Sequence, residues 1–307
     1  MKLAVLVVSG LVVVGCATGE HAKPAAAPLA LDAAMETTFA TEVATQIERI
    51  CASAPTATLE QVALYGKACA SSDGAGCLKA GALYMCGKGV AKNDAIALSL
   101  FDKSCTFHDE AGCQISAHVR IAGAITKRDI PAGLALLDAS CARGTAGACA
   151  TIGTALLMSE RPEMKVQGLG RASRACTLGD DDACSNVAIA TAEGIGGPKN
   201  LPKAVALAKA ACARNNPMSC GVLGLMELQG VGMPKDPVAA TKLLTMSCDA
   251  GTAKSCMYLA GMQTDAAIAM DLLKKSCDGG FGQACRVLAD AAQPTAVMTS
   301  APSPTMF

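Results

Sequence analysis

Aromatic residues make up only 3% of this 307-residue sequence, and tryptophan is absent. Strands favour aromatic and β-branched residues, so this shortage argues against a β-sandwich, whereas the abundant alanine suits closely packed helices. Basic and acidic residues number 26 each, and no long basic run occurs. We therefore expect no nucleic-acid partner.

Several catalytic and metal-binding patterns are also missing. The sequence has no Cys-x-x-Cys, which redox enzymes often use, and none of Ser-x-x-Lys, Ser-Asp-Asn or Lys-Thr-Gly, the motifs of serine β-lactamases. It has three histidines, His21, His108 and His118, too few for a metal ion in every repeat described below. We assign no catalytic residue, no cofactor and no metal ligand.

The N-terminus has the layout of an export signal. Met1-Lys2 precedes an apolar run from Leu3 to Gly15 that is too short to span a bilayer. The run ends in Val-Val-Gly followed by Cys16, which resembles a bacterial lipobox, so we expect residues 1–15 to be removed and Cys16 to be lipidated. An ordinary signal peptide is the alternative. Because Ala17 rather than Asp follows, the pattern favours an outer-membrane lipoprotein facing the periplasm or the cell surface.

Composition predicts the limits of the folded part. Residues 16–34 are rich in Ala and Pro without any period, as expected of a tether. A helical pattern begins near Met35, and the repeats described below continue to residue 291. Residues 292–307 lack periodicity and are expected to be disordered.

Cysteines repeat with strict spacing in the middle of the chain. Fourteen of the seventeen form seven pairs whose members enclose seven residues each, and successive first cysteines lie 36, 36, 35, 36, 36 and 29 residues apart. Repeats of this length indicate a solenoid, and an exported chain favours structural disulfides over free thiols or a metal array. The pairs are Cys69/Cys77, Cys105/Cys113, Cys141/Cys149, Cys176/Cys184, Cys212/Cys220, Cys248/Cys256 and Cys277/Cys285.

The residues around these pairs predict helical hairpins. A helical stretch from Ala75 ends at Gly87 and Gly89, which can adopt positive φ, and Asn93 or Asp94 can cap the next helix, which reaches Cys105. Each cysteine pair then joins the end of one hairpin to the start of the next. The predicted fold is an all-α solenoid of disulfide-linked helical hairpins over residues 35–291.

This pattern resembles the Sel1-like repeat family, which is TPR-like, and particularly its cysteine-rich secreted branch known from Helicobacter. The resemblance rests on residues 83–105 and on copies of the glycine turn at 194–200 and 230–236, within a coverage of about 58–290. It implies an adaptor that binds protein or peptide partners. Relatives described as β-lactam-binding or β-lactamase-like imply an alternative, a peptidoglycan-directed enzyme, and a structural spacer is a third hypothesis.

Some units depart from the pattern. Residues 123–128 and 159–163 lack Gly-x-Gly, so we expect their turns to follow different paths. The last unit is shortened around residues 261–265, which suits a terminal cap. Two further cysteines, Cys51 and Cys86, lie at equivalent ends of successive first helices, and we predict an eighth disulfide if the first helix is rotated or slipped to bring them within reach.

The remaining polar clusters have structural interpretations. Asp180, Asp181 and Asp182 are expected to form a solvated loop that favours the N-terminus of a helix beginning near Ala183, with calcium binding as the alternative. His108 is expected in a loop and His118 on a helix face, and the three tyrosines, Tyr65, Tyr84 and Tyr258, are expected to be packing residues.

Overall fold

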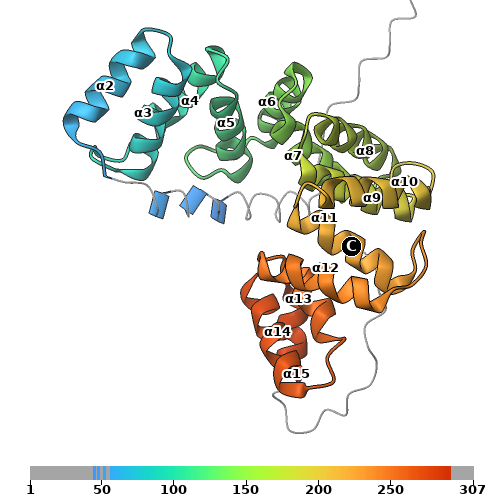
Figure 1. Cartoon of the computed structure of the whole chain (residues 1–307). Coiled ribbons are helices and arrows are strands. Elements are labelled where there is room, and N and C mark those ends of the chain that lie inside the picture. The colour runs from blue at the N-terminus through green and yellow to red at the C-terminus, as the bar shows by residue number, and fades with distance from the viewer. Residues whose placement is uncertain (1–43, 46, 49–50, 53–55, 292–307) are drawn as a thin grey trace, which may run out of the picture.

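The computed structural model describes residues 44–45, 47–48, 51–52 and 56–291. Over these residues the chain forms fourteen bounded helices and no strand, arranged as consecutive antiparallel hairpins (Figure 1). This confirms the predicted all-α solenoid. The predicted signal, tether and C-terminal tail, including Cys16, lie outside the described residues.

The helices alternate between two roles. We call the helices that begin each hairpin the inner helices: α3 Gly74–Cys86, α5 Glu110–Ala122, α7 Ala146–Leu157, α9 Asp181–Glu193, α11 Pro217–Gln229, α13 Ala253–Ala260 and α15 Gly282–Ala291. Their partners are the outer helices: α2 Leu59–Ala70, α4 Asp94–Thr106, α6 Ile130–Arg143, α8 Pro162–Thr177, α10 Leu201–Cys212, α12 Pro237–Asp249 and α14 Ala266–Asp278.

Local sequence signals set most helix boundaries. Thr58 caps α2 in a reciprocal capping box with Gln61, and Asn93 caps α4 by accepting a hydrogen bond from the Ile96 amide. The inner helix α3 ends at Gly87, whose φ of 65° is left-handed. These three boundaries match the capping and turn residues of the sequence.

The glycine turn also packs one hairpin against the preceding one. A side chain at Gly196 would overlap with the backbone carbonyl of Lys165 in α8, and one at Gly89 with the carbonyl of Ala57. Both glycines have positive φ. The second glycine of the turn is therefore required for repeat stacking as well as for the turn itself.

The two turns that lack Gly-x-Gly differ from each other. The α5–α6 turn closes with a hydrogen bond from the Asp129 amide to the Arg120 carbonyl, as the α3–α4 turn does from Asn93 to Tyr84. The closure is therefore the same, and the expected difference in path is limited to the position of the second glycine, where residue 125 does not take the positive φ of Gly89. In contrast, α7 ends at Met158 in a right-handed conformation, so the α7–α8 turn does follow another path.

The buried residues of the described part form five clusters along the array, and small side chains, chiefly Ala and Cys, are the most numerous among them. Leu207 on α10 packs against two neighbouring clusters of buried residues, one of which includes Val187 of α9 and Ala172 of α8. Larger side chains such as Phe101, Leu134 and Met226 are fully buried between them. Sharing of clusters between hairpins makes each unit depend on its neighbours, as expected for a solenoid.

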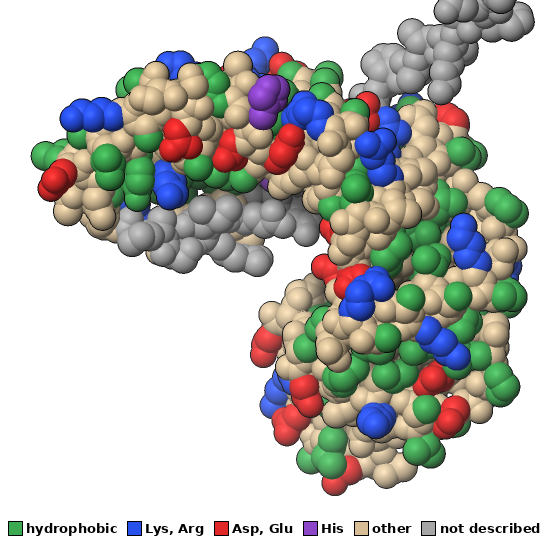
Figure 2. All heavy atoms as spheres, turned by 45° about the horizontal axis from the view of Figure 1, so that its top comes forward, with side chains coloured by type: hydrophobic (Ala, Val, Ile, Leu, Met, Phe, Trp, Pro, Cys, Tyr) green, Lys and Arg blue, Asp and Glu red, His purple; other side chains and the backbone are tan. Residues whose placement is uncertain are grey.

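The array bends into an arc. The inner helices from α3 to α13 line the side that faces the hollow between the two arms (Figure 1), and consecutive inner helices contact one another more extensively than consecutive outer helices do. On the face shown in Figure 2, acidic and basic side chains are interspersed. Within the described part of the chain, no helix is long and apolar enough to cross a membrane.

Candidate binding surface

Disulfides fix the joints between hairpins. Each of the seven regular pairs links the end of an outer helix to the first turns of the next inner helix, with Cα atoms 4.4 to 4.7 Å apart. At least one cysteine is buried in six of these seven links, the exception being Cys277–Cys285. These cysteines therefore act as structural staples within the core.

The second cysteine of each regular link is the fourth residue of an inner helix. Six of these seven side chains are at most 3% exposed: Cys77, Cys113, Cys149, Cys184, Cys220 and Cys256. Among the first cysteines of the links, three are buried, Cys69, Cys141 and Cys248, and the others are half-buried, Cys105, Cys176, Cys212 and Cys277. The buried cysteines are thus closed to a partner, and they shape the binding surface without contributing atoms to it.

Four of these sulfurs also lie close to the backbone carbonyl oxygen of the cysteine to which they are bonded. The distance from Sγ to oxygen is 3.4 Å from Cys149 to Cys141, 3.6 Å from Cys184 to Cys176, 3.4 Å from Cys220 to Cys212 and 3.5 Å from Cys256 to Cys248. A hydrogen bond from sulfur to the carbonyl oxygen would require an S–H group. All four sulfurs are in disulfides and carry no proton. The free-thiol alternative is therefore wrong for Cys149, Cys184, Cys220 and Cys256, and these contacts are packing contacts.

The eighth disulfide joins two inner segments. Cys51 and Cys86 are bonded across 35 residues, with Cα atoms 5.0 Å apart. Ile47 and Cys51 pack on a core cluster that includes Met85 and Val119. A Cα separation of 5.0 Å is what facing residues of two helices reach at the ordinary spacing of about 8–10 Å between helix axes, because each Cα lies about 2.3 Å from its axis.

Ion pairs reinforce the disulfide joints. Arg143, at the end of α6, donates to the Glu110 carboxylate in the first turn of α5 over 2.8 Å and contacts Cys113 Sγ. The hydrogen bond from Arg143, aided by the hydroxyls of Ser140 and Thr145 and opposed by burial, lowers the pKa of Glu110 to about 2. Sequence reasoning missed this contact.

The spacing of acidic residues and arginines in the sequence could have revealed the Glu110–Arg143 ion pair. An acidic residue precedes an arginine by 33 positions in three bonded pairs, Glu110/Arg143, Asp138/Arg171 and Asp181/Arg214. A separation just under one repeat is what contacts within or between neighbouring hairpins require.

The acidic cluster is more ordered than expected. Asp180 caps α9 by accepting from the Ala183 amide, and the helix already begins at Asp181. Asp181 pairs with Arg214, and the Asp182 carboxylate accepts from Asn216 Nδ2 over 2.8 Å. The loop assignment is thus wrong for Asp181 and Asp182, which lie in the first turn of α9, whereas the expected placement of acidic residues at this helix N-terminus is confirmed. Both carboxylates also hold the joint that follows α10.

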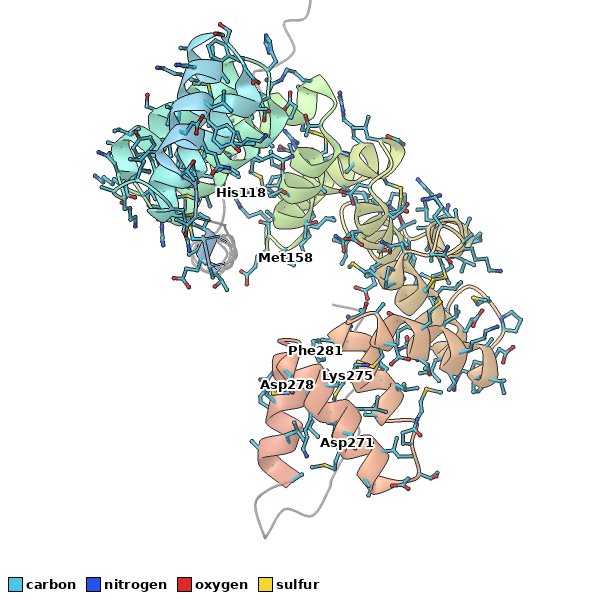
Figure 3. All side chains as sticks on the ribbon, turned by 60° about the vertical axis from the view of Figure 1, so that its left-hand side comes forward. His118, Met158, Asp271, Lys275, Asp278 and Phe281 are labelled. Carbon is cyan, nitrogen blue, oxygen red and sulfur yellow. A yellow bond between two sulfur atoms is a disulfide. The ribbon has the colours of Figure 1, made fainter. Side chains whose placement is uncertain are left out.

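The inner face carries both polar and apolar side chains. Figure 3 shows His118 of α5 and Met158 at the end of α7 on the side of the hollow. The Met158 side chain is 60% exposed. Farther along, Asn186 of α9 donates to the Thr154 hydroxyl of α7 over 3.0 Å. This surface can offer hydrogen bonds and apolar contacts to a chain lying across several hairpins.

Charged and phenolic groups lie on two inner helices in the C-terminal half of the chain, α9 and α13. Burial lowers the pKa of Lys254 and raises that of Tyr258, and the negative charge of Glu193 acts on both groups. Lys254 and Tyr258 are one turn apart on α13, whereas Glu193 ends α9.

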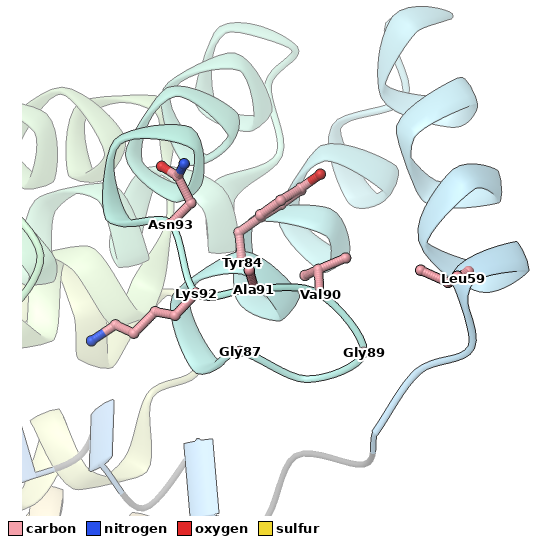
Figure 4. A pocket seen from close by; sticks show the side chains of 8 residues that line it. All are labelled: Leu59, Tyr84, Gly87, Gly89, Val90, Ala91, Lys92 and Asn93. Atoms are coloured by element: carbon pink, nitrogen blue, oxygen red, sulfur yellow. The ribbon is translucent and has the colours of Figure 1, made fainter.

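The first glycine turn, residues 87–93, borders a separate open pocket of about 660 Å³ (Figure 4). Leu59 lies on one side of it, and Tyr84, Val90 and Lys92 lie on the other. The middle residue of this turn is Lys88, whereas Ile195 and Val231 occupy the same position in two later turns and pack on the preceding hairpin. An apolar contact is thus replaced by a charged residue here, and Leu59 stays 76% exposed.

The remaining predicted residues have structural surroundings. His108 lies in the α4–α5 joint with a φ of 61°, and His118 lies on α5, where burial lowers its pKa. Tyr65 stacks under Lys79, whose Nζ is 5.4 Å from the ring centroid. No group of three or more His, Cys, Asp or Glu residues in the described regions could hold a metal ion.

The repeat pattern matches a known family. The Sel1 repeat is found at residues 74–106, 181–216, 217–252 and 253–281, each beginning where an inner helix begins. The chain is a Sel1-repeat protein. Its disulfide pattern fits the cysteine-rich branch, and the unmatched region between residues 107 and 180 contains both turns without Gly-x-Gly.

Solved structures agree on the fold of this Sel1-repeat protein. It superposes on a Sel1 repeat protein from Oxalobacter formigenes with a TM-score of 0.60 at 17% identity, covering 67% of this chain and 86% of that one. It also superposes on a protective antigen of uropathogenic Escherichia coli with an SLR fold, at a TM-score of 0.61 and 20% identity, covering 84% of this chain and 57% of that one. No curated protein matches the chain.

Proposed function

We propose that this Sel1-repeat protein is a lipid-anchored adaptor of the cell envelope that binds protein or peptide partners along its inner face. The observation that carries the proposal is the row of inner helices around the hollow, with exposed Met158 at one point and the Asn186–Thr154 hydrogen bond beside it. Helical solenoids bind extended partners on such faces by contacts spread over several units.

The location is supported by two independent features. Eight disulfides indicate an oxidising compartment outside the cytoplasm. The lipobox-like sequence before Cys16 supports a lipid anchor. Replacement of Cys16 by Ala should move the protein from the detergent phase to the aqueous phase after phase separation, and unchanged partitioning would contradict the anchor.

Site-specific photo-crosslinking in intact cells tests the binding face. A photoreactive residue at Met158 should give discrete cross-linked species that mass spectrometry can identify. The matched control is Val238, which begins an outer helix and is 82% exposed. Equal labelling from both positions would contradict an inner-face site, and no species from either would favour a structural spacer.

The enzymatic alternative has a direct assay. A β-lactam-directed hydrolase would turn over the chromogenic substrate nitrocefin when the purified full chain is used. Because the adaptor requires no chemistry, we expect no turnover. Hydrolysis would instead direct attention to the hydroxyl and carboxylate groups of the inner face.

A further inference from the structure

The regular disulfides differ in how far solvent reaches their two cysteines. Both cysteines are buried in three links: Cys69–Cys77, Cys141–Cys149 and Cys248–Cys256. In three others the second cysteine is buried and the first is half-buried: Cys105–Cys113, Cys176–Cys184 and Cys212–Cys220. A dissolved thiol can reach these last three links at the first cysteine, so the buried sulfur of the second cysteine is the one that leaves when the bond is broken.

Two of these three buried sulfurs lie beside a guanidinium group. Arg143 Nη2 donates to Cys113 Sγ over 3.3 Å, and Arg214 Nη2 is 3.9 Å from Cys184 Sγ. Both arginines occupy the same place in the repeat, two residues after the first cysteine of the next joint along the chain. The contact between positive charge and sulfur is therefore a feature of the repeat that only some units carry.

Arg143 is held beside Cys113 by the Glu110 carboxylate. Its Nε donates to one carboxylate oxygen over 2.8 Å, and its Nη2 donates to the other over 3.3 Å. A guanidinium group has five N–H donors in a planar fork, so one arginine can serve the carboxylate and the sulfur together. A charge-assisted hydrogen bond is thus already in place for negative charge that forms on Cys113 Sγ.

From this geometry we infer that Cys105 is a site of S-thiolation by small-molecule thiols. The thiol gives its proton to water, and the resulting thiolate attacks Cys105 Sγ. The bond from Cys105 to Cys113 breaks, its electron pair leaves on Cys113 Sγ, and a mixed disulfide forms at Cys105. Arg143 stabilises the Cys113 thiolate. One disulfide is exchanged for another, so no oxidant or further reductant is consumed.

Cys212 provides the matched comparison. Its link to Cys220 spans the same eight residues and has an equally buried leaving sulfur, but Ala250 occupies the place that Arg143 has in its repeat. A thiolate beside an arginine is a better leaving group. We therefore expect exchange at Cys105 to be about tenfold faster than at Cys212.

The experiment is incubation of the oxidised full chain with reduced glutathione, followed by trapping of free thiols with N-ethylmaleimide and peptide mapping by mass spectrometry. A glutathione adduct should accumulate on Cys105, with maleimide on Cys113, about tenfold faster than on Cys212. The rate at Cys176 should lie between them, because its arginine is farther from the leaving sulfur. Equal rates at Cys105 and Cys212, or an adduct on Cys113 in place of Cys105, would overturn the assignment.

A variant separates the charge of Arg143 from its support of the joint. In Arg143→Gln, the rate at Cys105 relative to that at Cys212 should fall from about ten to about one. Arg174→Gln is the control, because Arg174 lies in the last turn of α8 and donates to the Ala142 carbonyl; it should leave the ratio unchanged.

The direction of the change is decisive. If Arg143 only braced the joint, its loss would loosen the link and raise the rate at Cys105 relative to Cys212, which would contradict the proposal. The readout requires no binding partner, so failure of the proposed adaptor function would leave this result intact.

Discussion

The two edges of the solenoid connect consecutive helices in different ways. On one edge, outer helices pass to inner helices through joints closed by disulfides such as Cys212–Cys220. On the other, inner helices pass to outer helices through turns in which Gly194 and Gly196 take positive φ. One edge is fixed covalently, and the other is fixed by backbone conformation and close packing against the preceding hairpin.

This difference shows where each kind of constraint is needed. Small core side chains such as Ala172 and Ala208 are fully buried but contribute little apolar area. Covalent links compensate by restricting the unfolded chain. The edge formed by the glycine turns packs on the preceding hairpin, so it adds stability only when that hairpin is folded. A substitution in a glycine turn therefore measures how much stacking of hairpins contributes to stability.

The largest effect should follow from reducing every disulfide. The chain-entropy model assigns about 2.6 kcal/mol to a nine-residue loop, so seven such links sum to at most about 18 kcal/mol. This exceeds the total stability of about 5–15 kcal/mol typical of a domain. We expect the fully reduced protein to lose its cooperative thermal transition by circular dichroism, and a retained transition would show that packing alone suffices.

Next in size is a change at the glycine edge. Gly196→Ala should destabilise the fold by about 2–4 kcal/mol, because φ is positive and the new methyl group overlaps with the carbonyl of Lys165. The measurement is chemical denaturation. Gly170→Ala is the control, since no atom lies within 4 Å of its added β-carbon in α8, and it should stabilise by about 0.5–1 kcal/mol. Equal effects would mean that the turn does not support stacking.

Sequence reasoning succeeded where constraints are local or repeat strictly. The spacing of Cys69 and its equivalents, the cap at Thr58 and the stop at Gly87 together predict the solenoid. It failed where the partner lies about one repeat away, as for Asp181 with Arg214, because a single carboxylate carries no sign of its partner. The curvature that places Met158 beside the hollow depends on packing along the whole array.

Acid should lower the stability of the protein by protonating Glu110, which pairs with Arg143 beside the disulfide joints. Its pKa of about 2 is below the ordinary value of 4.5, so its stabilising effect is complete above pH 4.5 and is lost as the pH falls toward 2. Because the pair with Arg143 is partly exposed, solvent screening reduces the effect to about 1 kcal/mol.

Denaturation at pH 6 and pH 2.5 measures this dependence. Glu110→Gln should remove most of the Glu110 contribution, whereas Glu163→Gln in the first turn of α8 should leave the dependence close to that of the unaltered protein. An identical pH profile for both variants would show that the Glu110–Arg143 contact does not stabilise the joint.

The smallest effect compares two individual helix caps, one on each edge. Asn200, after a glycine turn, accepts a hydrogen bond from the Lys203 amide, whereas Thr252, in a disulfide joint, makes no side-chain bond to its helix. Asn200→Ala should therefore cost about 1 kcal/mol and Thr252→Ala about 0.3 kcal/mol in denaturation experiments. Equal losses would mean that the hydrogen bond from the Lys203 amide to Asn200 adds nothing to the stability of α10.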